Sequence, residues 1–288
     1  MPAVAQATVD AIGIGVQKSA TSWLFRCLVE HPDLRGSILE ESDKELNFFN
    51  HHWEKGFDWY EGHFRVGPWR NLEFSTLYFP DRNVPERIRG YNPEVRLILC
   101  LRNPVERAIS QHRHEIRRGR VDGERVDFWE AARRNPAYVE QGLYAAHMER
   151  WLEHFDLDRF HVIEYDRVRA EPDGVLRDAF AFLDVAPGFE PSTTEERVNV
   201  SRVHGNGPIR AALSMGVSGA RFVLGERLTR RIGASPLGAP IQGHRYVEVE
   251  RRAILPEGSE ERHRVAELFR PDLVRLGVLL GRDFSHWT

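Results

Sequence analysis

A lysine-containing loop near the start of the chain has the composition of an anion-binding site. Residues 10–16 (DAIGIGV) form a short apolar run, and Gln17 to Ser22 (QKSATS) follow it before a helical pattern, WLFRCLVEHP. Gly13 and Gly15 permit close approach of the backbone, and Lys18 supplies a charge on a flexible stem. Three hydroxyls stand beside the N–H groups of the helix start. This composition predicts a phosphate-type site in a strand–loop–helix unit.

The loop is not a Walker A motif, which requires Gly, four further residues, and then Gly-Lys-Ser/Thr. Here Gly15 precedes Lys18 by three positions, and Gln17 stands directly before the lysine. The structural alternative is an ordinary turn with a solvated cation. Lysine usage favours function, because only three of the 40 basic residues are lysines, Lys18, Lys44 and Lys55, in a chain that otherwise uses arginine.

Two further apolar runs predict the elements that would position such a site. Residues 96–101 (RLILCL) are almost continuously apolar, as expected for a strand covered on both faces, and a helix is predicted over 105–118. Residues 160–165 (FHVIEY) form a third strand candidate between helical patterns at 143–155 and 174–183. Alternation of strands and helices predicts an α/β fold with a central parallel sheet and helices on both faces.

The C-terminal third is organised differently. From about 187 to 256 periodicity fades and Gly, Ser, Pro and Thr accumulate, which is typical of a lid, an acceptor-binding segment or an oligomer contact. Helical spacing returns over 259–280, with Ser259 as N-cap and Pro271 expected to separate two short helices. Since no linker divides the chain, we expect one domain over 1–288.

Composition excludes several classes of protein. No run of about 18 apolar residues and no secretory leader is visible, so neither stable membrane insertion nor secretion is expected. Two cysteines in apolar segments favour buried thiols and a cytoplasmic location. A net charge of −3 argues against nucleic-acid binding. The histidine pairs 51–52 and 112–114 are poorly spaced for metal, so no metal site is predicted.

The segment GVQKSATSWLFRCLVEHPDL, residues 15–34, resembles the 5′-phosphosulfate-binding segment of sulfotransferases that use 3′-phosphoadenosine-5′-phosphosulfate (PAPS). The family form is close to GVxKxGTTxLxxxLxxHP, and this chain departs from it at Ala20 and Ser22. Neither change removes a backbone N–H. The resemblance implies a P-loop-like three-layer fold with a central parallel sheet flanked by helices.

Lys44-Glu45-Leu46-Asn47-Phe48-Phe49 is similar to the KE-x-x-FF element of the heparan sulfate type and of many bacterial sulfotransferases, where the Glu is the general base. A solvated Lys-Glu pair ahead of two buried phenylalanines is the alternative. The segment 73–79 (EFSTLYF) resembles the family stretch EKTPxYF, with Phe74 at the lysine position. The missing positive charge argues against a highly anionic glycan acceptor.

LRNPVERAISQH, residues 101–112, resembles the segment that grips the nucleotide 3′-phosphate. A planar guanidinium suits phosphate, although a solvated helix face explains most other arginines nearby. Gly142-Leu143-Tyr144 with Trp151 resembles a family helix that lines the core and the site, and Ser201 and Arg202 lie where the family closes a loop over the nucleotide. The resemblance thus implies catalytic roles for Glu45, Lys18 and Lys44, and donor contacts from Lys18, Ser19, Ala20, Thr21, Ser22, Trp23, Arg102, Ser110, Ser201 and Arg202.

The function implied by the resemblance is metal-free transfer of a sulfuryl group from PAPS to a hydroxyl or amine of a small-molecule, lipid or glycan acceptor. Glu45 would remove the acceptor proton, and Lys18 would stabilise charge on the leaving 3′-phosphoadenosine-5′-phosphate. A P-loop kinase or NTPase, or a non-catalytic nucleotide-binding module, would share the strand–loop–helix geometry. The sequence leaves the acceptor and the oligomeric state open.

Overall fold

The computed structural model describes residues 7–38, 45–118, 120–121, 127–192, 194 and 255–287. These residues fall into two compact units. The first comprises residues 1–108, 137–198 and 260–288, and the second comprises 109–136 and 199–259, each within the described ranges. The prediction of one domain over 1–288 stays a prediction.

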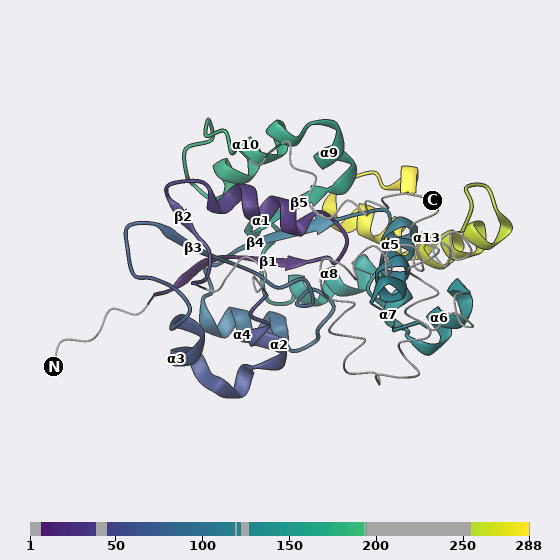
Figure 1. Ribbon diagram of the computed structural model, residues 1–288, viewed down its shortest axis with the longest axis horizontal. Coiled ribbons are helices and arrows are strands. Elements are labelled where there is room, and N and C mark those ends of the chain that lie inside the picture. The colour runs from purple at the N-terminus through teal and green to yellow at the C-terminus, as the bar shows by residue number, and fades with distance from the viewer. Residues whose placement is uncertain are drawn as a thin grey trace, which may run out of the picture. The chain divides into compact units, whose positions relative to one another are not determined.

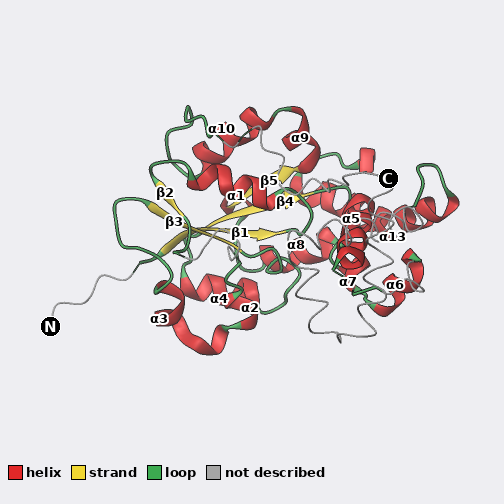
Figure 2. Ribbon diagram, in the orientation of Figure 1, coloured by secondary structure: helices red, strands yellow, loops and turns green. Residues whose placement is uncertain are grey.

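The first unit is built on five parallel strands in the order β2-β3-β1-β4-β5. Their bounds are β1 Val9–Gly15, β2 Leu34–Arg35, β3 Arg70–Phe74, β4 Arg96–Leu101 and β5 Phe160–Glu164. Gly13 of β1 is paired with Phe74 on one side and with Ile98 on the other. The predicted parallel sheet is therefore confirmed, with the apolar runs at 10–16, 96–101 and 160–165 supplying three of its strands (Figure 2).

Helices cover both faces of this sheet, which gives the predicted three-layer architecture. In Figure 1, α1, α9 and α10 lie over one face and α2, α3 and α4 over the other. The helices of the first unit are α1 Thr21–Val29, α2 Phe48–His51, α3 Gly56–Glu61, α4 Val84–Tyr91, α7 Ala137–Glu140, α8 Tyr144–Leu152, α9 Tyr165–Ala170, α10 Pro172–Phe182 and α13 Glu260–Leu280, with 3₁₀ turns at Trp53–Lys55, Leu157–Arg159 and Ser285–Trp287. In the second unit α6 spans Phe128–Arg134, and α5, Pro104–Arg117, begins in the first unit and continues into the second.

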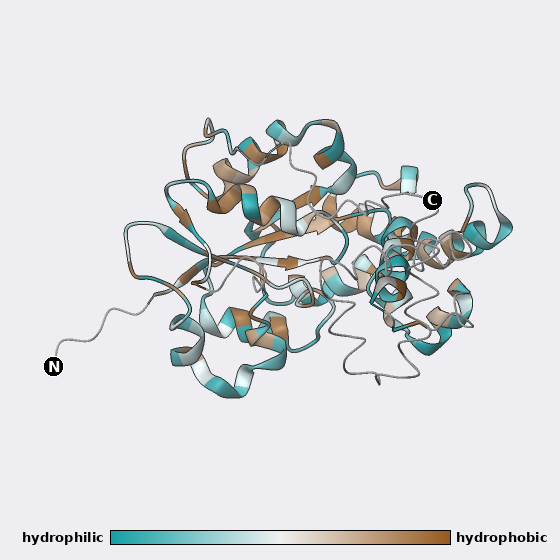
Figure 3. Ribbon diagram, in the orientation of Figure 1, coloured by the Kyte–Doolittle hydropathy of each residue, from teal (hydrophilic) through white to brown (hydrophobic). Residues whose placement is uncertain are grey.

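The core beneath α1 and α10 joins these helices to the sheet. Leu24, Cys27 and Leu28 of α1 pack with Ile98 and other strand residues, all essentially inaccessible to solvent. Hydrophobic colour accordingly concentrates in the central strands (Figure 3). Both cysteines are buried, and neither forms a disulfide. This packing fixes the start of α1 against the end of β1.

The prediction that Pro271 separates two helices is wrong, because α13 runs unbroken from Glu260, directly after Ser259, to Leu280. Pro271 removes one backbone donor and is exposed, whereas Phe269 and Leu273 on either side of it are buried. The Asp272 carboxylate also accepts the backbone N–H groups of Ala145 (2.8 Å) and Ala146 (3.1 Å) at the start of α8. Tertiary contacts therefore hold both halves of α13 in one helix.

Candidate active site

The loop between β1 and α1 presents backbone donors at the carboxyl edge of the sheet. Lys18 (φ 73°) and Ala20 (φ 62°) adopt the left-handed conformation, and Ser19 between them does not. Such alternation turns successive N–H groups toward one side, the arrangement that binds anions. The first intrahelical bond runs from Leu24 N to Ala20 O (3.0 Å), and the N-cap residue Ala20 makes no side-chain capping bond, so the first-turn N–H groups face the loop.

Ser19 adds a buried donor to this loop. Its side chain is fully buried, and its Oγ has no hydrogen-bond partner among the described residues. Because an unpaired buried hydroxyl is costly, this atom is suited to donate to a polar group of a ligand. Trp23 differs: its indole is buried and donates to Thr194 O at 3.2 Å, so only its backbone N–H faces the loop.

The departure from the family form at Ala20 has a conformational meaning. The family carries Gly where this chain has Ala20, and the left-handed φ of 62° is the region that glycine adopts without a Cβ penalty. The backbone conformation of the motif is thus kept with a less suitable side chain. Thr21, which follows, is buried, and Ser22 is half-buried.

Glu45, the predicted general base, lies beside the segment that follows β3. Thr76 Oγ1 donates to Glu45 Oε1 at 2.9 Å. This segment continues the sheet, since Ser75 N donates to Gly13 O (2.9 Å) and Phe79 N to Ile14 O (2.9 Å). Glu45 is thereby brought to the end of β1. The loop of residues 16–20, called the phosphate loop below, begins at this point. Lys44 lies outside the described residues.

Glu73 is a functional candidate that the motif comparison did not single out. Its fully buried carboxylate accepts the hydroxyls of Tyr60 (2.7 Å), Ser75 (2.5 Å) and Tyr78 (2.7 Å). Burial raises the pKa of Glu73 to about 7, the three hydroxyl donors oppose this shift, and the charge of Glu45 adds to it. The signal in the sequence was the resemblance of residues 73–79 to the family stretch EKTPxYF, which begins with this glutamate.

The same hydroxyls hold the backbone that follows Glu45. Ser75 Oγ accepts the N–H of Asn47 at 2.9 Å, and Tyr78 Oη accepts that of Phe49 at 3.3 Å. Glu73 therefore anchors the backbone of residues 47–49 through two hydroxyl bridges.

Phe74, at the family's lysine position, belongs to the core. Its ring is 1% exposed, lies 5.4 Å from the ring of Phe25, and leaves no room for a Cβ at Gly13. This side chain supplies no charge to the site.

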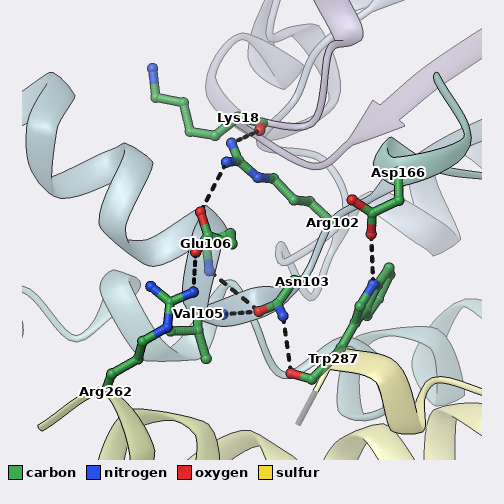
Figure 4. Close-up of polar contacts among 8 residues, drawn as sticks. All are labelled: Lys18, Arg102, Asn103, Val105, Glu106, Asp166, Arg262 and Trp287. Atoms are coloured by element: carbon green, nitrogen blue, oxygen red, sulfur yellow. Dashed lines mark hydrogen bonds and ion pairs between the residues drawn. The ribbon is translucent and has the colours of Figure 1, made fainter. Parts of the chain in front are cut away.

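Arg102, predicted to bind the 3′-phosphate, fastens the phosphate loop (Figure 4). One guanidinium nitrogen donates to the carbonyl of Lys18 at 3.0 Å, while the Lys18 side chain extends away from it. The guanidinium also lies 4.5 Å from the ring of Tyr165 and 3.4 Å from Glu106. Tyr144 Oη donates to the backbone carbonyl of Arg102 (2.8 Å), which places the predicted GxY helix, α8, at the site.

The start of α5 is tied to the C-terminal residues. Asn103 Oδ1 accepts the N–H of Val105 (2.9 Å) and, more distantly, that of Glu106 (3.3 Å), and its side-chain amide donates to Trp287 O (3.1 Å). The Trp287 indole donates to Asp166 at 2.9 Å. The sequence does not indicate the contacts of Trp287, because Asn103 is 184 positions away from it and Asp166 is 121 positions away.

The remaining predicted residues are not tested by these contacts. Ser110 lies on α5 in the second unit and is half-buried. Ser201 and Arg202, and nearly all of the loop-rich segment from 187 to 256, lie outside the described residues. Within the described ranges no group of three or more His, Cys, Asp or Glu side chains is arranged to hold a metal.

An open hollow of about 430 Å³ lies at the opposite, amino end of the sheet, where Asp10 and Arg70 line it. Asp184 there pairs with Arg70 at 2.8 Å and with Arg96 at 3.6 Å. Because these charges satisfy one another, we assign the chemistry to the carboxyl edge, where ligands of open parallel sheets bind.

Comparisons with known proteins show the family of this chain. The heparan sulfate glucosamine 3-O-sulfotransferase 5 of Homo sapiens is 32% identical over 190 residues, 62% of this chain and 54% of that protein. The bifunctional heparan sulfate N-deacetylase/N-sulfotransferase 3 of Homo sapiens is 29% identical over 196 residues, 62% of this chain and 22% of that protein. The matched part of this chain thus spans about half of the first relative and less of the second.

A sulfotransferase from Alicyclobacillus acidocaldarius, known from its crystal structure, has the same fold. It covers 98% of this chain and 99% of its own, with a TM-score of 0.63 and 23% identity. The sulfotransferase domain model matches residues 9–202, which contain the phosphate loop, Glu45 and Arg102. This chain therefore belongs to the sulfotransferase domain family.

Proposed function

We propose that this chain is an enzyme that transfers a sulfuryl group from PAPS to a hydroxyl or amine of an acceptor and releases 3′-phosphoadenosine-5′-phosphate. The observation that carries the proposal is the phosphate loop at the carboxyl edge of the sheet. It combines Lys18, the buried hydroxyl of Ser19, which has no partner in the described part of the chain, and the first turn of α1, whose N-cap residue Ala20 makes no side-chain capping bond. Glu45 is held next to it by Thr76.

The donor fits the residues present. Backbone N–H groups from Lys18 to Trp23, with the Ser19 hydroxyl, would hold the 5′-phosphosulfate, and Arg102 would hold the 3′-phosphate. Ser110 keeps the 3′-phosphate role that the family resemblance implies for it. The donor supplies the sulfuryl group and an anionic leaving group. Lys44, Ser201 and Arg202 keep the roles that the family resemblance implies for them.

The protein's own work is positioning and charge stabilisation. Glu45 accepts the proton of the acceptor hydroxyl or amine, and the hydroxyl of Thr76 fixes the orientation of that carboxylate. Lys18 stabilises the negative charge that develops on the leaving phosphate. None of these roles requires a metal ion.

For the acceptor we propose a glycan, a small molecule or a lipid of modest negative charge. The two human relatives are named for action on heparan sulfate. Phe74 is buried and neutral where the family has a lysine, which disfavours an acceptor as anionic as that polymer.

No helix in the described ranges is both long and apolar enough to cross a bilayer. A cytoplasmic location remains our proposal.

The test is an assay of PAPS with a panel of acceptors: a neutral glycan, a sulfated glycan, and phenolic and aliphatic alcohols. We expect one class to gain the mass of a sulfuryl group, with stoichiometric release of 3′-phosphoadenosine-5′-phosphate. In Glu45→Gln, turnover should fall by about a hundredfold or more while affinity for the bisphosphate is unchanged. Glu54→Gln, an exposed carboxylate on the following 3₁₀ turn, is the matched control and should keep wild-type turnover. Undiminished turnover in Glu45→Gln would remove the base assignment.

A further inference from the structure

Glu106 of α5 lies between two arginines that are distant in sequence (Figure 4). Its Oε2 lies 3.4 Å from a guanidinium nitrogen of Arg102, and its Oε1 is in direct contact with the guanidinium of Arg262, near the start of α13. The side chains of Arg102, Glu106 and Arg262 are 17%, 35% and 21% exposed. All three are therefore reachable by a ligand and only partly screened by water.

The position of this cluster is fixed from several sides. Arg102 is held by the Lys18 carbonyl and by the ring of Tyr165, as described above. Asn103 caps the first turn of α5 and is itself anchored by the carbonyl of Trp287. Glu106 therefore faces Arg102 from a rigid helix start rather than from a loop.

Arg262 determines the net charge of the cluster formed by Arg102, Glu106 and Arg262. Arg102 and Glu106 alone form a neutral pair, which offers a phosphate little attraction and places a carboxylate beside it. With Arg262 the cluster carries one net positive charge, and each carboxylate oxygen has its own guanidinium. A phosphate monoester carries nearly two negative charges at neutral pH, so this balance decides whether Arg102 can bind it.

We propose that Arg262 is a charge-balancing residue of the nucleotide 3′-phosphate site: it neutralises Glu106 and so leaves the Arg102 guanidinium available to the phosphate. This inference rests on the proposed function, because it takes the ligand to be an adenosine 3′,5′-bisphosphate. Arg262 acts through Glu106 and not by touching the phosphate. It extends the donor site to α13, which the matched family segment, ending at residue 202, does not contain.

The test compares two ligands on the full chain by calorimetry: 3′-phosphoadenosine-5′-phosphate and adenosine 5′-phosphate, which lacks the 3′-phosphate. In Arg262→Ala we expect affinity for the bisphosphate to fall about tenfold or more, with affinity for the monophosphate unchanged. Arg262→Lys should retain most of the bisphosphate affinity, because charge and not fork geometry is required. Arg270→Ala, which removes an exposed arginine paired with Glu267 on the same helix, should behave as wild type.

The double variant Glu106→Gln/Arg262→Ala separates charge balance from direct contact or from folding. We expect it to recover the bisphosphate affinity to within about threefold of wild type, because the cluster again carries one net positive charge once both the carboxylate and its partner are gone. An unchanged bisphosphate affinity in Arg262→Ala, an equal loss for both ligands, or no recovery in the double variant would each overturn the inference. If the wild type binds the monophosphate but gains nothing from the 3′-phosphate, the proposed function itself fails and the inference with it.

Discussion

Individual residues of the site combine suitable chemistry with backbone strain. Lys18 and Ala20 both adopt left-handed conformations within three positions, and the hydroxyl of Ser19 between them has no partner among the described residues. Strained backbone and unpaired buried donors lower stability unless the surrounding structure or a ligand compensates for them. The conformation that presents the donors of the phosphate loop therefore lowers the stability of the unliganded chain.

The strain at Ala20 predicts a stabilising substitution. Ala20→Gly should raise the free energy of unfolding by about 1 kcal/mol, because glycine adopts a φ of 62° without the clash of a Cβ. Urea denaturation monitored by circular dichroism measures the change. Ala146→Gly, in the first turn of α8, is the matched control and should lower stability by about 0.5 kcal/mol. A less stable Ala20→Gly variant would contradict the strain assigned to this residue.

At the scale of elements, the site depends on close packing of β1 against β3. A Cβ at Gly13 would lie 2.3 Å from the ring of Phe74, which is itself confined by Phe25. The same pairing brings the segment after β3 to the end of β1 and with it Thr76, the partner of Glu45. The position of Glu45, the predicted general base, therefore depends on the pairing of β1 with β3.

Gly13→Ala should lower the free energy of unfolding by about 2 kcal/mol, since the buried Phe74 ring must move. Gly90→Ala, in α4, is the control: a Cβ added at Gly90 would have no other atom within 4 Å, and alanine favours the helix, so stability should rise by about 0.5 kcal/mol. Thermal unfolding of both variants gives the comparison. Equal stability of Gly13→Ala and wild type would show that the strands tolerate a wider separation.

Much of the layer architecture could be predicted from sequence, because buried parallel strands are continuously apolar and β4 coincides with RLILCL. β3 was not recognised as a strand, since its sequence RNLEF places Asn71 and Glu73 in the interior. Glu73 is tolerated there because Tyr60, Ser75 and Tyr78 pair with it. Such compensation is tertiary and leaves no local pattern.

Part of the candidate site could also be predicted from the sequence. The phosphate loop, Glu45 and Arg102 lie in short motifs, and the structure gives Glu45 and Arg102 defined partners. Glu106 and Arg262 form their contact across 156 positions, so neither spacing nor composition indicates it. The sequence does not predict the continuous α13 either. Burial of Phe269 and Leu273 outweighs the intrinsic effect of Pro271 on the helix.

At the scale of the whole molecule, buried histidines couple stability to pH. Burial lowers the pKa of both His147 and His161 from 6.5 to about 4. An unfolded chain takes up these protons below pH 6.5 while the folded chain does not, so their contribution is present above pH 6.5 and is lost as the pH falls toward 4. Glu73, with its pKa raised to about 7, acts in the opposite direction over the same range.

His161→Phe isolates one of these contributions. The ring stacks on Phe182 at 5.1 Å, and its Nε2 is buried without a partner among the described residues, so phenylalanine fits the site. Between pH 6.5 and pH 5 the free energy of unfolding of this variant should fall by about 1.5 kcal/mol less than that of wild type. Urea midpoints at the two pH values measure the difference. Identical pH dependence in both proteins would refute the shift assigned to His161.

In the proposed function, the loop, Arg102 and the first turn of α1 form a site for an adenosine 3′,5′-bisphosphate. The most direct test is thermal unfolding with 3′-phosphoadenosine-5′-phosphate or with ATP and Mg²⁺, for wild type and Arg102→Ala, because a ligand that binds only the folded state raises its melting temperature. We predict stabilisation by the bisphosphate, none by ATP with Mg²⁺, and loss of the effect in Arg102→Ala. Stabilisation by ATP alone would instead indicate a P-loop kinase or NTPase, and no response to either nucleotide would contradict a donor site at this loop.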